Sequence, residues 1–459
     1  MNQEIDLILR EIIKRGGRPY FIGGCVRDTV LLVESKDIDV EVFNLDIDSL
    51  ISILEEHGKV DVVGKSFGVV KLTTKDNDYD FSLPRKDSKI GVGHKDFEVV
   101  IDQSMTVEEA ALRRDFTFNA MSMDVNGRIF DPFHGCEDLE NRVLRNTSDQ
   151  FSEDPLRVLR SFQFAGRFNL IGELGLLKLC RQIKDQFQHL PKERIWVEFE
   201  KWAMKSVNHK AGLDFLVMSH WIDCFPELRN ILGVPQELDF HPEGCVYTHT
   251  CYVVNAMNDI CNREGIDGER KLILILAALC HDFGKAETTI YRKGKISAPK
   301  HDQVGVKISE NFLLSINCPH RIIDQVLPLV REHMCHLNGF VSAKMVNKLA
   351  VRLGKANIED LCLLIEADHS GRPPLQKQLP RNAKLLLELA RLLKVNEKAP
   401  PKIVNGKDII DIIPPGKDMG QLLDWLYSKQ LECKFRSLED GLNMMKQHQI
   451  YHKYRKVQA

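Results

Sequence analysis

The sequence predicts an α+β protein, in which a small mixed sheet with helices forms an N-terminal head and an all-α body follows. Short strand patterns separated by Gly-containing turns are concentrated between residue 19 and about residue 145 of the 459-residue chain. After residue 146, apolar residues recur at every third or fourth position, which is typical of helices. Hydrophobic residues make up 43% of the chain, so there is enough apolar material for more than one core.

Clusters of Pro and Gly mark the boundaries that we expect inside the helical body. They occur at residues 233–244, 371–374 and 398–418. Together with the change of pattern near residue 146, they predict four regions. These are a head over 1–145, a helical neck over 146–225, a second helical domain over 226–375 and a helical C-terminal region over 376–459.

Charge is distributed unevenly along the chain, although the net charge is only −2. Residues 1–150 carry about −10 and the remaining residues about +8. The acidic head favours binding of metal ions. The basic body favours contact with a nucleic acid backbone, which should weaken as the salt concentration rises.

The sequence also predicts a cytoplasmic protein without membrane contact. Its longest apolar run, residues 272–280, is too short to span a bilayer, and the charged N-terminus lacks the features of a secretory signal. The twelve Cys residues include no CxxC pair, which favours reduced, mostly buried thiols over disulfides or a zinc site.

The head begins with an amphipathic helical pattern in residues 1–17, followed by PYFIGG, a strand that runs into a Gly turn. In GGCVRD (23–28), Gly23 and Gly24 let backbone N–H groups approach a phosphate closely where a helix begins. The strand KDIDVEVF then places Asp37 and Asp39 on one face, because residues i and i+2 of a strand point the same way. Paired carboxylates suit Mg²⁺, so these elements predict a site for a nucleoside triphosphate with Mg²⁺.

Further strands are expected at VDVVG, GVVKLTT and DYDFSL. The last contains Asp80, a candidate third carboxylate for chemistry with two metal ions. Asp78 lies on the same face, and the sequence leaves the choice between them open. Residues 84–101 have no clear period and predict a mobile loop. The helices that follow are clearest in DPLRVLRSFQFAGRF and ERIWVEFEKWAMKSV.

Several strings of the chain occur in the order seen in one family. They are GGCVRD with KDIDVEVF, RRDFTFNAMSMD (113–124), DPFHGCEDLENRVLR (131–145), EDPLRVLRSFQFAGRF (153–168) and ERIWVEFEKW (193–202). The sequence resembles bacterial class II tRNA nucleotidyltransferases, the CCA-adding enzymes of the poly(A) polymerase superfamily, and the resemblance extends to an appended HD domain. It implies addition of C, C and A to the 3′ end of tRNA without a template, with CTP and ATP as substrates.

The resemblance implies roles for residues of the head and neck. Arg114 and Asp115 would contact the ribose and phosphates of the nucleotide, and Asn119 would shape the same pocket. Other Arg side chains suit bidentate binding of the triphosphate, and these are Arg27, Arg113 and Arg160. Residues Arg85, Lys86 and Asp87 match a flexible element that family members use when the pocket switches from C to A. This match argues against an enzyme that adds only C.

The EDPLR string carries the implied base selection through Glu153, Asp154 and Arg157. If Asp154 and Arg157 lie on one helix, their spacing places them on the same face. An Asp acceptor beside an Arg donor matches the amine and ring nitrogen of cytosine and adenine, whereas uracil and guanine carry a carbonyl oxygen in place of the amine. The protein itself would then select CTP and ATP.

A second constellation lies in residues 226–375. It consists of His249 in YTHT, His281 and Asp282 in ALCHDFGK, and Asp368 in EADHSGR. These resemble the metal ligands of HD-domain phosphohydrolases, in which one or two divalent ions activate water. His301 and His333 are candidates for further ligands. The resemblance implies phosphatase and 2′,3′-cyclic phosphodiesterase activity with Ni²⁺, Mg²⁺ or another divalent metal.

Three alternatives stay open from the sequence. The first is a poly(A) polymerase, although the pI near 6.8 differs from the strongly basic extensions of such enzymes. The second is a specialised enzyme that adds only CC or only A. The third is an HD hydrolase whose head merely binds nucleotides. The sequence does not predict the oligomeric state or the residues that contact tRNA.

Overall fold

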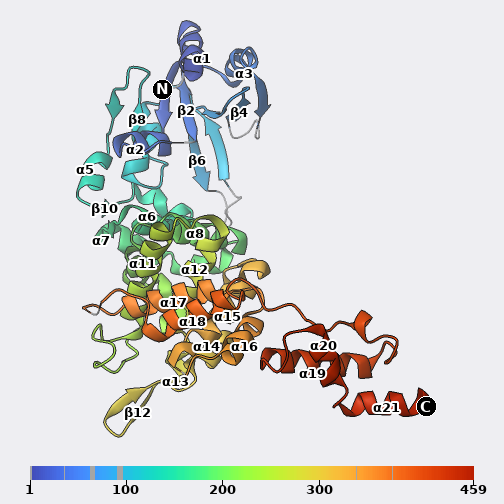
Figure 1. Cartoon of the computed structure of the whole chain (residues 1–459). Helices are drawn as coiled ribbons and strands as arrows, with labels where there is room; N and C mark the ends of the chain where they lie inside the picture. The colour runs from blue at the N-terminus through green and yellow to red at the C-terminus, as the bar shows by residue number, and fades with distance from the viewer. Residues whose placement is uncertain are drawn as a thin grey trace. The chain divides into compact units, whose positions relative to one another are not determined.

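The computed structural model describes residues 3–35, 37–62, 68–89, 97–337, 339–374 and 376–458. The chain forms two compact units, Met1–Cys224 and Phe225–Ala459 (Figure 1). The first contains a mixed sheet and helices, and the second is mainly helical, which confirms the predicted fold class. The four regions expected from the sequence divide the chain more finely and stay a prediction.

The strands of the first unit form a mixed sheet and two small pairs. In chain order they are β1 (Arg18–Ile22), β2 (Ile38–Phe43), β3 (Lys59–Val62), β4 (Val69–Thr73), β5 (Asp78–Ser82), β6 (Arg85–Lys89), β7 (Phe97–Ile101), β8 (Ser122–Met123), β9 (Ile129–Phe130), β10 (Val143–Leu144) and β11 (Ile171–Gly172). The seven-stranded sheet has the order β3-β4-β5-β2-β1-β8-β9. Strands β2 and β5 pair in parallel, and the other neighbours in this sheet pair antiparallel.

Helices cover the sheet and continue beyond it. Those of the first unit are α1 (Gln3–Lys14), α2 (Gly24–Val30), α3 (Ile47–Glu55), α4 (Val107–Ala111), α5 (Gly135–Glu140), α6 (Leu156–Phe168), α7 (Leu174–Gln182), α8 (Lys192–Lys205) and α9 (His209–Met218). The amphipathic pattern at the N-terminus is confirmed, because α1 buries Ile5, Ile8, Leu9 and Ile12 along one face. The strands expected at PYFIGG, KDIDVEVF, VDVVG, GVVKLTT and DYDFSL are also confirmed as β1 to β5.

The prediction of a mobile loop over residues 84–101 is wrong for the described residues of this segment. Strands β6 and β7 form an antiparallel hairpin in which Arg85 pairs with Ile101 and Lys89 with Phe97. A two-stranded ribbon is held by its ladder of backbone hydrogen bonds, so its sequence needs no alternation of apolar residues to form. Lys86 adds an ion pair of 2.8 Å with Asp102. The Asp87 side chain and residues 90–96 lie outside the described part of the chain.

Helix α6 carries the aromatic core that joins the sheet to the helices of the first unit. Phe164 packs edge-to-face against Phe116 and Phe118, which lie beside the sheet, at ring distances of 5.4 and 5.5 Å. On its other side, α6 packs against α8 and α9 through Phe162 and Trp202, whose rings are 5.2 Å apart. These buried rings fix α6 between the sheet and the helices α8 and α9.

The second unit is built from helices around a buried hairpin of α11 and α12. Its elements are α10 (Pro226–Asn230), α11 (Val246–Glu264), α12 (Gly268–Cys280), α13 (Lys285–Thr288), β12 (Ile290–Arg292), β13 (Lys295–Ser297), α14 (His301–Ser315), α15 (His320–Glu332), α16 (Ala343–Leu353), α17 (Ile358–Ser370), α18 (Arg381–Leu392), α19 (Lys417–Leu431), α20 (Leu438–Met445) and α21 (Gln449–Gln458). Nearly every residue of α12 is buried, because α11, α15 and α17 pack around it. The apolar run that the sequence shows at 272–280 is therefore a core helix.

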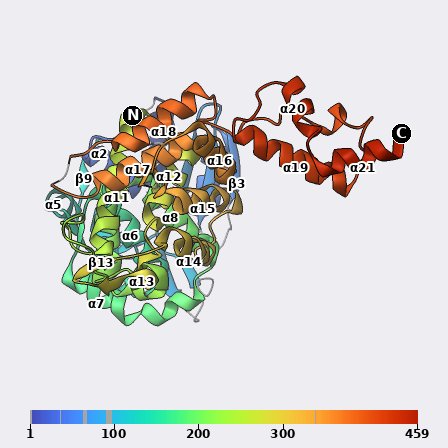
Figure 2. The same cartoon turned by 60° about the horizontal axis from the view of Figure 1, so that its bottom comes forward.

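The last helices have a small core of their own. Figures 1 and 2 both show α19, α20 and α21 grouped together at the C-terminal end. Their buried cluster includes Ile413, Leu422, Leu426 and Met445. Within the second unit, Glu432 after α19 forms ion pairs of 3.0 and 3.1 Å with two Lys side chains of α16, Lys344 and Lys348.

The helices and the cysteines agree with two features of the sequence, its short apolar runs and its lack of CxxC pairs. Among the described residues, no helix is both long and apolar enough to cross a membrane. All twelve cysteines are free, and most of them are buried.

Candidate active sites

The first candidate site lies where β2 and β5 run side by side. In their parallel register, Asp39 lies directly opposite Asp80, and Asp37 immediately precedes β2. Burial raises the pKa of Asp39, and the charges of Asp80 and Asp37 raise it further against the attraction of Arg114. The three carboxylates therefore share one charged environment, which is the arrangement that a divalent cation stabilises.

The register also separates the two candidates for the third carboxylate. Asp78, at the start of β5, forms an ion pair of 3.0 Å with Lys71 on β4, and this contact lowers the pKa of Asp78. Asp80, in contrast, lies opposite Asp39 and helps to raise the pKa of Asp39. This geometry favours Asp80 over Asp78 as the partner of Asp39.

Gly23 brings the turn after β1 into the same site. It has a φ of +69° and directly precedes α2. A Cβ atom at this position would lie 3.2 Å from an Nη of Arg114 and 3.9 Å from Oδ2 of Asp39. The left-handed backbone and this close approach both favour glycine. The turn, Asp39 and Arg114 thus meet at one place, as a phosphate site beside a metal site requires.

Glu41 is a site residue that the sequence reasoning missed. It lies two residues after Asp39 on β2 and is only 2% exposed. One of its oxygens accepts a hydrogen bond of 2.7 Å from Arg113, and the other accepts one of 3.3 Å from Arg114. The buried carboxylate orients both guanidinium groups. The alternation Asp37, Asp39, Glu41 in the strand was the signal that could have identified it.

A buried polar network lies next to these arginines. Asp115 accepts hydrogen bonds from Asn119 at 2.9 Å and from Arg160 at 2.6 Å. Burial would raise the pKa of Asp115, but Arg160 and Asn119 outweigh it, so that this pKa is lowered. Arg27 donates to the side-chain oxygen of Asn119 at 2.8 Å and to Asp28, and it is only 4% exposed. Its charge points into the protein, which favours positioning of Asn119 over direct phosphate binding by Arg27.

The expectation that Asp154 and Arg157 lie on one helix is wrong. Helix α6 begins at Leu156, and Asp154 precedes it with extended backbone, where its carboxylate caps the Leu156 N–H at 3.0 Å. A short carboxylate before a Pro competes for local backbone hydrogen bonds and therefore starts the helix instead of entering it. Arg157 donates to the backbone oxygens of Gln150 and Arg113 at 2.9 and 2.7 Å.

The second candidate site gathers side chains from five elements of the second unit. His249 comes from α11, His281 and Asp282 follow α12, His301 begins α14, and Asp368 comes from α17. His333, at the end of α15, completes the group. The six residues that the sequence singled out, four as ligands and two as further candidates, thus meet at one place. They form two triads of ligand atoms, His249 with His281 and Asp368, and Asp282 with His301 and His333.

Asp282 belongs to the second triad and also approaches the first. Its Oδ2 is 3.7 Å from Nε2 of His249 and 3.2 Å from Nε2 of His281. Its Oδ1 is 3.3 Å from Nε2 of His301 and 3.9 Å from Nε2 of His333. The residue is 1% exposed, and although burial would raise its pKa, the surrounding His and Lys charges hold this pKa well below its usual range. One carboxylate thus faces both groups of imidazoles.

The backbone orients three of the imidazoles toward Asp282. The Nδ1 atoms of His281, His301 and His333 lie 2.8, 2.8 and 2.6 Å from the carbonyl oxygens three residues earlier. An Nδ1–H that donates to a carbonyl leaves Nε2 with a lone pair. These Nε2 atoms crowd together, with 3.2 Å between His301 and His333. In their neutral form, imidazoles whose Nε2 lone pairs are aimed at one another and at a carboxylate fit divalent metal ions.

Glu243 and His241 support His249 and were missed from the sequence. Oε1 of Glu243 lies 2.7 Å from Nδ1 of His249 and 2.9 Å from Nδ1 of His241. Burial lowers the pKa of His249, but Asp368 and Glu243 outweigh it and raise the pKa to about 9. The run HPEGCVYTHT, in which the three residues are close together, was the available signal.

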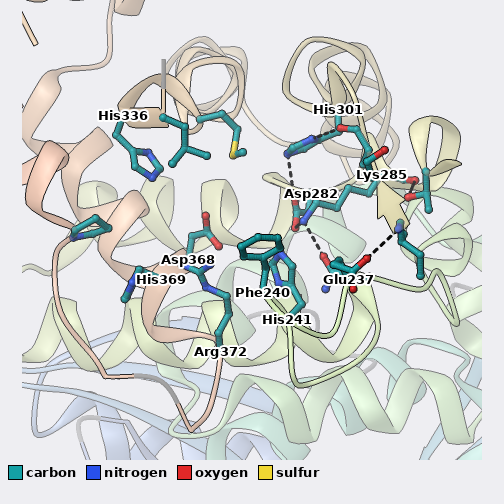
Figure 3. Close-up of a pocket in the computed structure, with 18 of the residues that line it drawn as sticks. Glu237, Phe240, His241, Asp282, Lys285, His301, His336, Asp368, His369 and Arg372 are labelled. Carbon is teal, nitrogen blue, oxygen red and sulfur yellow. Dashed lines mark hydrogen bonds and ion pairs between the residues drawn. The ribbon is translucent and has the colours of Figure 1, made fainter. Parts of the chain in front are cut away.

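A cavity of about 700 Å³ opens beside the second site (Figure 3). Asp282, His301 and Asp368 line one part of it, together with Lys285, whose Nζ is 2.6 Å from Asp282. Phe240 and Arg372 are also part of the lining. The cavity is large enough for a ligand of nucleotide size and combines acidic, basic and aromatic groups.

Comparison with protein families connects both sites to known domains. The model of the poly A polymerase head domain matches residues 19–145, and the HD domain model matches residues 246–396. A multifunctional CCA protein of Shewanella frigidimarina is 31% identical over 81% of this chain and 88% of its own length. One of Actinobacillus pleuropneumoniae is 33% identical over 77% of this chain and 85% of its own length.

This chain belongs to the multifunctional CCA protein family. Solved structures of CCA-adding enzymes show the same fold. That of Bacillus stearothermophilus in complex with CTP aligns with a TM-score of 0.62 at 18% identity, covering 100% of this chain and 99% of the other. That of Thermotoga maritima complexed with tRNA aligns with a TM-score of 0.59 at 18% identity, over 97% and 95% of the two chains. A member of the multifunctional CCA protein family thus presents the carboxylates of the head and the histidines of the HD domain in two separate units.

Proposed function

We propose that this chain adds C, C and A to the 3′ end of tRNA without a template, with CTP and ATP as substrates and pyrophosphate as the second product. The observation that carries this proposal is the juxtaposition of Asp39 with Asp80, beside the Gly23 turn and Arg114, in a chain of the multifunctional CCA protein family. The charge pattern supports tRNA as the partner, because the residues after 150 are basic.

The chain's own residues have defined parts in this reaction. Asp37, Asp39 and Asp80 would hold Mg²⁺, which lowers the charge of the triphosphate and favours ionisation of the tRNA 3′-hydroxyl. Arg114, oriented by Glu41, faces the Gly23 turn and is placed to receive phosphate oxygens. The 3′-oxygen forms a bond to the α-phosphorus, the bond from that phosphorus to the β-bridging oxygen breaks, and pyrophosphate leaves.

Base selection is assigned to the segment that begins α6. Glu153, Asp154 and Arg157 lie together there, and Arg157 is held by backbone carbonyl groups that also tie it to Arg113. Asp154 lies 3.6 Å from Arg194 of α8. An acceptor and a donor fixed at the start of one helix match the edges of cytosine and adenine and reject those of uracil and guanine.

The test is nucleotide incorporation on a tRNA that ends at the discriminator base, followed by sequencing of the product. CTP and ATP together should yield CCA and then stop. A long tail from ATP alone would identify a poly(A) polymerase instead. Growth that stops at CC with both nucleotides present, or A added only to tRNA already ending in CC, would identify a specialised enzyme.

We also propose that the HD domain hydrolyses phosphate esters, including 2′,3′-cyclic phosphates. The two triads, one of which contains Asp282, carry this second activity. The imidazole-rich ligands of the two triads favour Ni²⁺ or a similar transition metal over Mg²⁺. Such ions lower the pKa of bound water. Addition of water to the cyclic phosphorus and cleavage of one P–O bond leaves a monoester. Release of product from 2′,3′-cyclic AMP with each metal tests the activity, and no turnover with any divalent metal would contradict it.

A further inference from the structure

The two-stranded hairpin of the second unit is a basic, exposed element beside the HD cavity. Strands β12 and β13 are joined by a tight turn in which Lys293 and Gly294 have φ values of +52° and +76°. The hairpin sequence IYRKGKIS contains no acidic residue. Arg292, Lys293 and Lys295 are exposed, and none of them forms an ion pair with another described residue. Three positive charges thus face solvent without compensation.

The same hairpin exposes an aromatic ring. Tyr291 is 75% exposed, between Ile290, at 45%, and Arg292. The pairing of Tyr291 with Ile296 fixes its backbone, and the Ile296 N–H donates a 3.0 Å hydrogen bond to Glu237. The hairpin is therefore anchored at its base while Tyr291 and the charged side chains remain accessible. Single-strand binding surfaces combine these two features, an aromatic ring for a base and cations for phosphates.

Two adjoining cavities connect this hairpin with the metal ligands. The 700 Å³ cavity beside Asp282 and a second cavity of about 430 Å³ share Pro235, Thr289 and Ile296 in their linings. The second cavity is otherwise lined by apolar groups, among them Tyr291. The two cavities are thus neighbours, and the second lies between the exposed ring and the wall of the first.

Further cations lie along the first cavity. Lys285 is next to Asp282, and Arg372 and Arg381 are part of the lining. Figure 3 shows the Arg372 side chain beside the cavity. Its planar guanidinium group suits a phosphate, because two of its N–H groups match two phosphate oxygens.

We propose that hairpin β12–β13 and the two adjoining cavities bind the end of a single RNA strand and direct its terminal phosphate to the HD cluster. The terminal nucleotide occupies the larger cavity, and the preceding base stacks on Tyr291. The next phosphates contact Arg292, Lys293 and Lys295. The inference rests on the phosphohydrolase activity proposed above and adds the surface that holds the strand beyond its terminal nucleotide.

The test compares two substrates of the full-length protein. One is a five-nucleotide RNA that ends in a 2′,3′-cyclic phosphate, and the other is 2′,3′-cyclic AMP, which cannot reach the hairpin. The triple variant R292E/K293E/K295E should lower kcat/KM for the RNA about tenfold or more at low salt and change that for the mononucleotide less than twofold. Its salt dependence for the RNA should be less steep by about 2 in logarithmic slope, as expected for three lost phosphate contacts on a single strand.

Two further variants separate stacking from charge. Tyr291→Phe keeps the ring and should retain the activity toward RNA, whereas Tyr291→Ala should lose about fivefold or more. The matched control is K394E/K398E/K407E, which reverses three charges on exposed Lys side chains that form no ion pair among the described residues. This control should hydrolyse both substrates as the wild type does.

Each outcome decides between specific possibilities. Equal hydrolysis of the RNA by the wild type and the triple variant would overturn the inference and leave the phosphohydrolase intact. An equal loss on both substrates would also overturn it, because the hairpin would then act on the cluster itself. If the wild type hydrolyses neither substrate, the phosphohydrolase proposal fails. Photocrosslinking of a 4-thiouridine oligonucleotide then decides the RNA surface alone, with label at residues 290–297 supporting it and its absence overturning it.

Discussion

Asp39 and Asp80 lie directly opposite each other on the parallel strands β2 and β5. They are far apart in the sequence, and only the pairing of these two strands brings their carboxylates together. Burial raises the pKa of Asp39, and Asp80 adds to this effect. The repulsion between them is what a bound divalent cation would relieve, so the strand pairing itself creates the candidate site for nucleotidyl transfer.

Replacing Asp80 by Asn should therefore lower nucleotide addition far more than replacing Asp78 by Asn. We expect a loss of at least about 100-fold for Asp80→Asn, because a carboxylate aimed at the reacting centre is removed. Asp78→Asn should retain activity within a few-fold, because its partner is Lys71. Incorporation of labelled CTP into a tRNA lacking CCA measures both. Equal effects of the two changes would contradict the assignment of Asp80.

The two active sites should be separable by mutation. Asp282→Asn is expected to abolish hydrolysis of 2′,3′-cyclic AMP, because this carboxylate belongs to one triad and faces two imidazoles of the other. It should leave CCA addition unchanged, since that site lies in the other unit. Replacing Asp37 and Asp39 together by Ala should have the reverse effect. Both activities measured on both variants form the test, and joint loss in either one would count against two independent sites.

Gly284 is expected to be essential for the HD site. A Cβ atom there would overlap the backbone carbonyl of His301 and approach the N of Gly305 to 2.6 Å. Gly284→Ala should displace His301 from Asp282 and lower phosphohydrolase activity, while CCA addition persists. The matched control is Gly420→Ala, where a Cβ atom would meet nothing within 4 Å. Retained phosphohydrolase activity in Gly284→Ala would show that α14 can shift without cost to the site.

The Asp115 network should make the stability of the first unit depend on pH. Because Arg160 and Asn119 lower the pKa of Asp115 despite its burial, its contribution is complete above its ordinary value near 3.8 and is lost as the pH falls through the lowered value. Asp115→Asn should reduce the free energy of unfolding at pH 7 by about 1.5 to 3 kcal/mol. Urea unfolding at pH 7 and at progressively lower pH should show the difference between variant and wild type shrinking. A difference that stays constant down to pH 2 would contradict this account.

Binding of tRNA should weaken steeply with salt. The residues after 150 carry about +8, and each phosphate contact releases counterions. Between 50 and 200 mM salt, we expect the Kd for tRNA to rise by about tenfold or more. Filter binding or fluorescence anisotropy measures this change. An affinity that is independent of salt would exclude the basic body as the surface for the tRNA backbone.

Much of the fold could be predicted because its signals are local. The alternation in DYDFSL and the helical period in ERIWVEFEKW predict β5 and α8, since each pattern depends on neighbouring residues alone. The hairpin of β6 and β7 could not be predicted in this way, because the polar strand β6 (RKDSK) shows no apolar alternation and is held by backbone hydrogen bonds to β7. The position of Asp154 before α6 was missed for a related reason, since a helix start depends on capping and not on the period of apolar residues.

By itself, the sequence determined the chemical groups and their local order: the DID carboxylates after a Gly turn, the adjacent His281 and Asp282, and the apolar helix that precedes them. Tertiary structure alone decided which distant groups complete each site. The pairing of β2 with β5 placed Asp80 opposite Asp39, and helix packing brought Asp368 to His249 and His333 to Asp282. The reason is physical: periodicity places a side chain on a face, whereas contact between faces depends on strand pairing and buried packing between segments far apart in the chain.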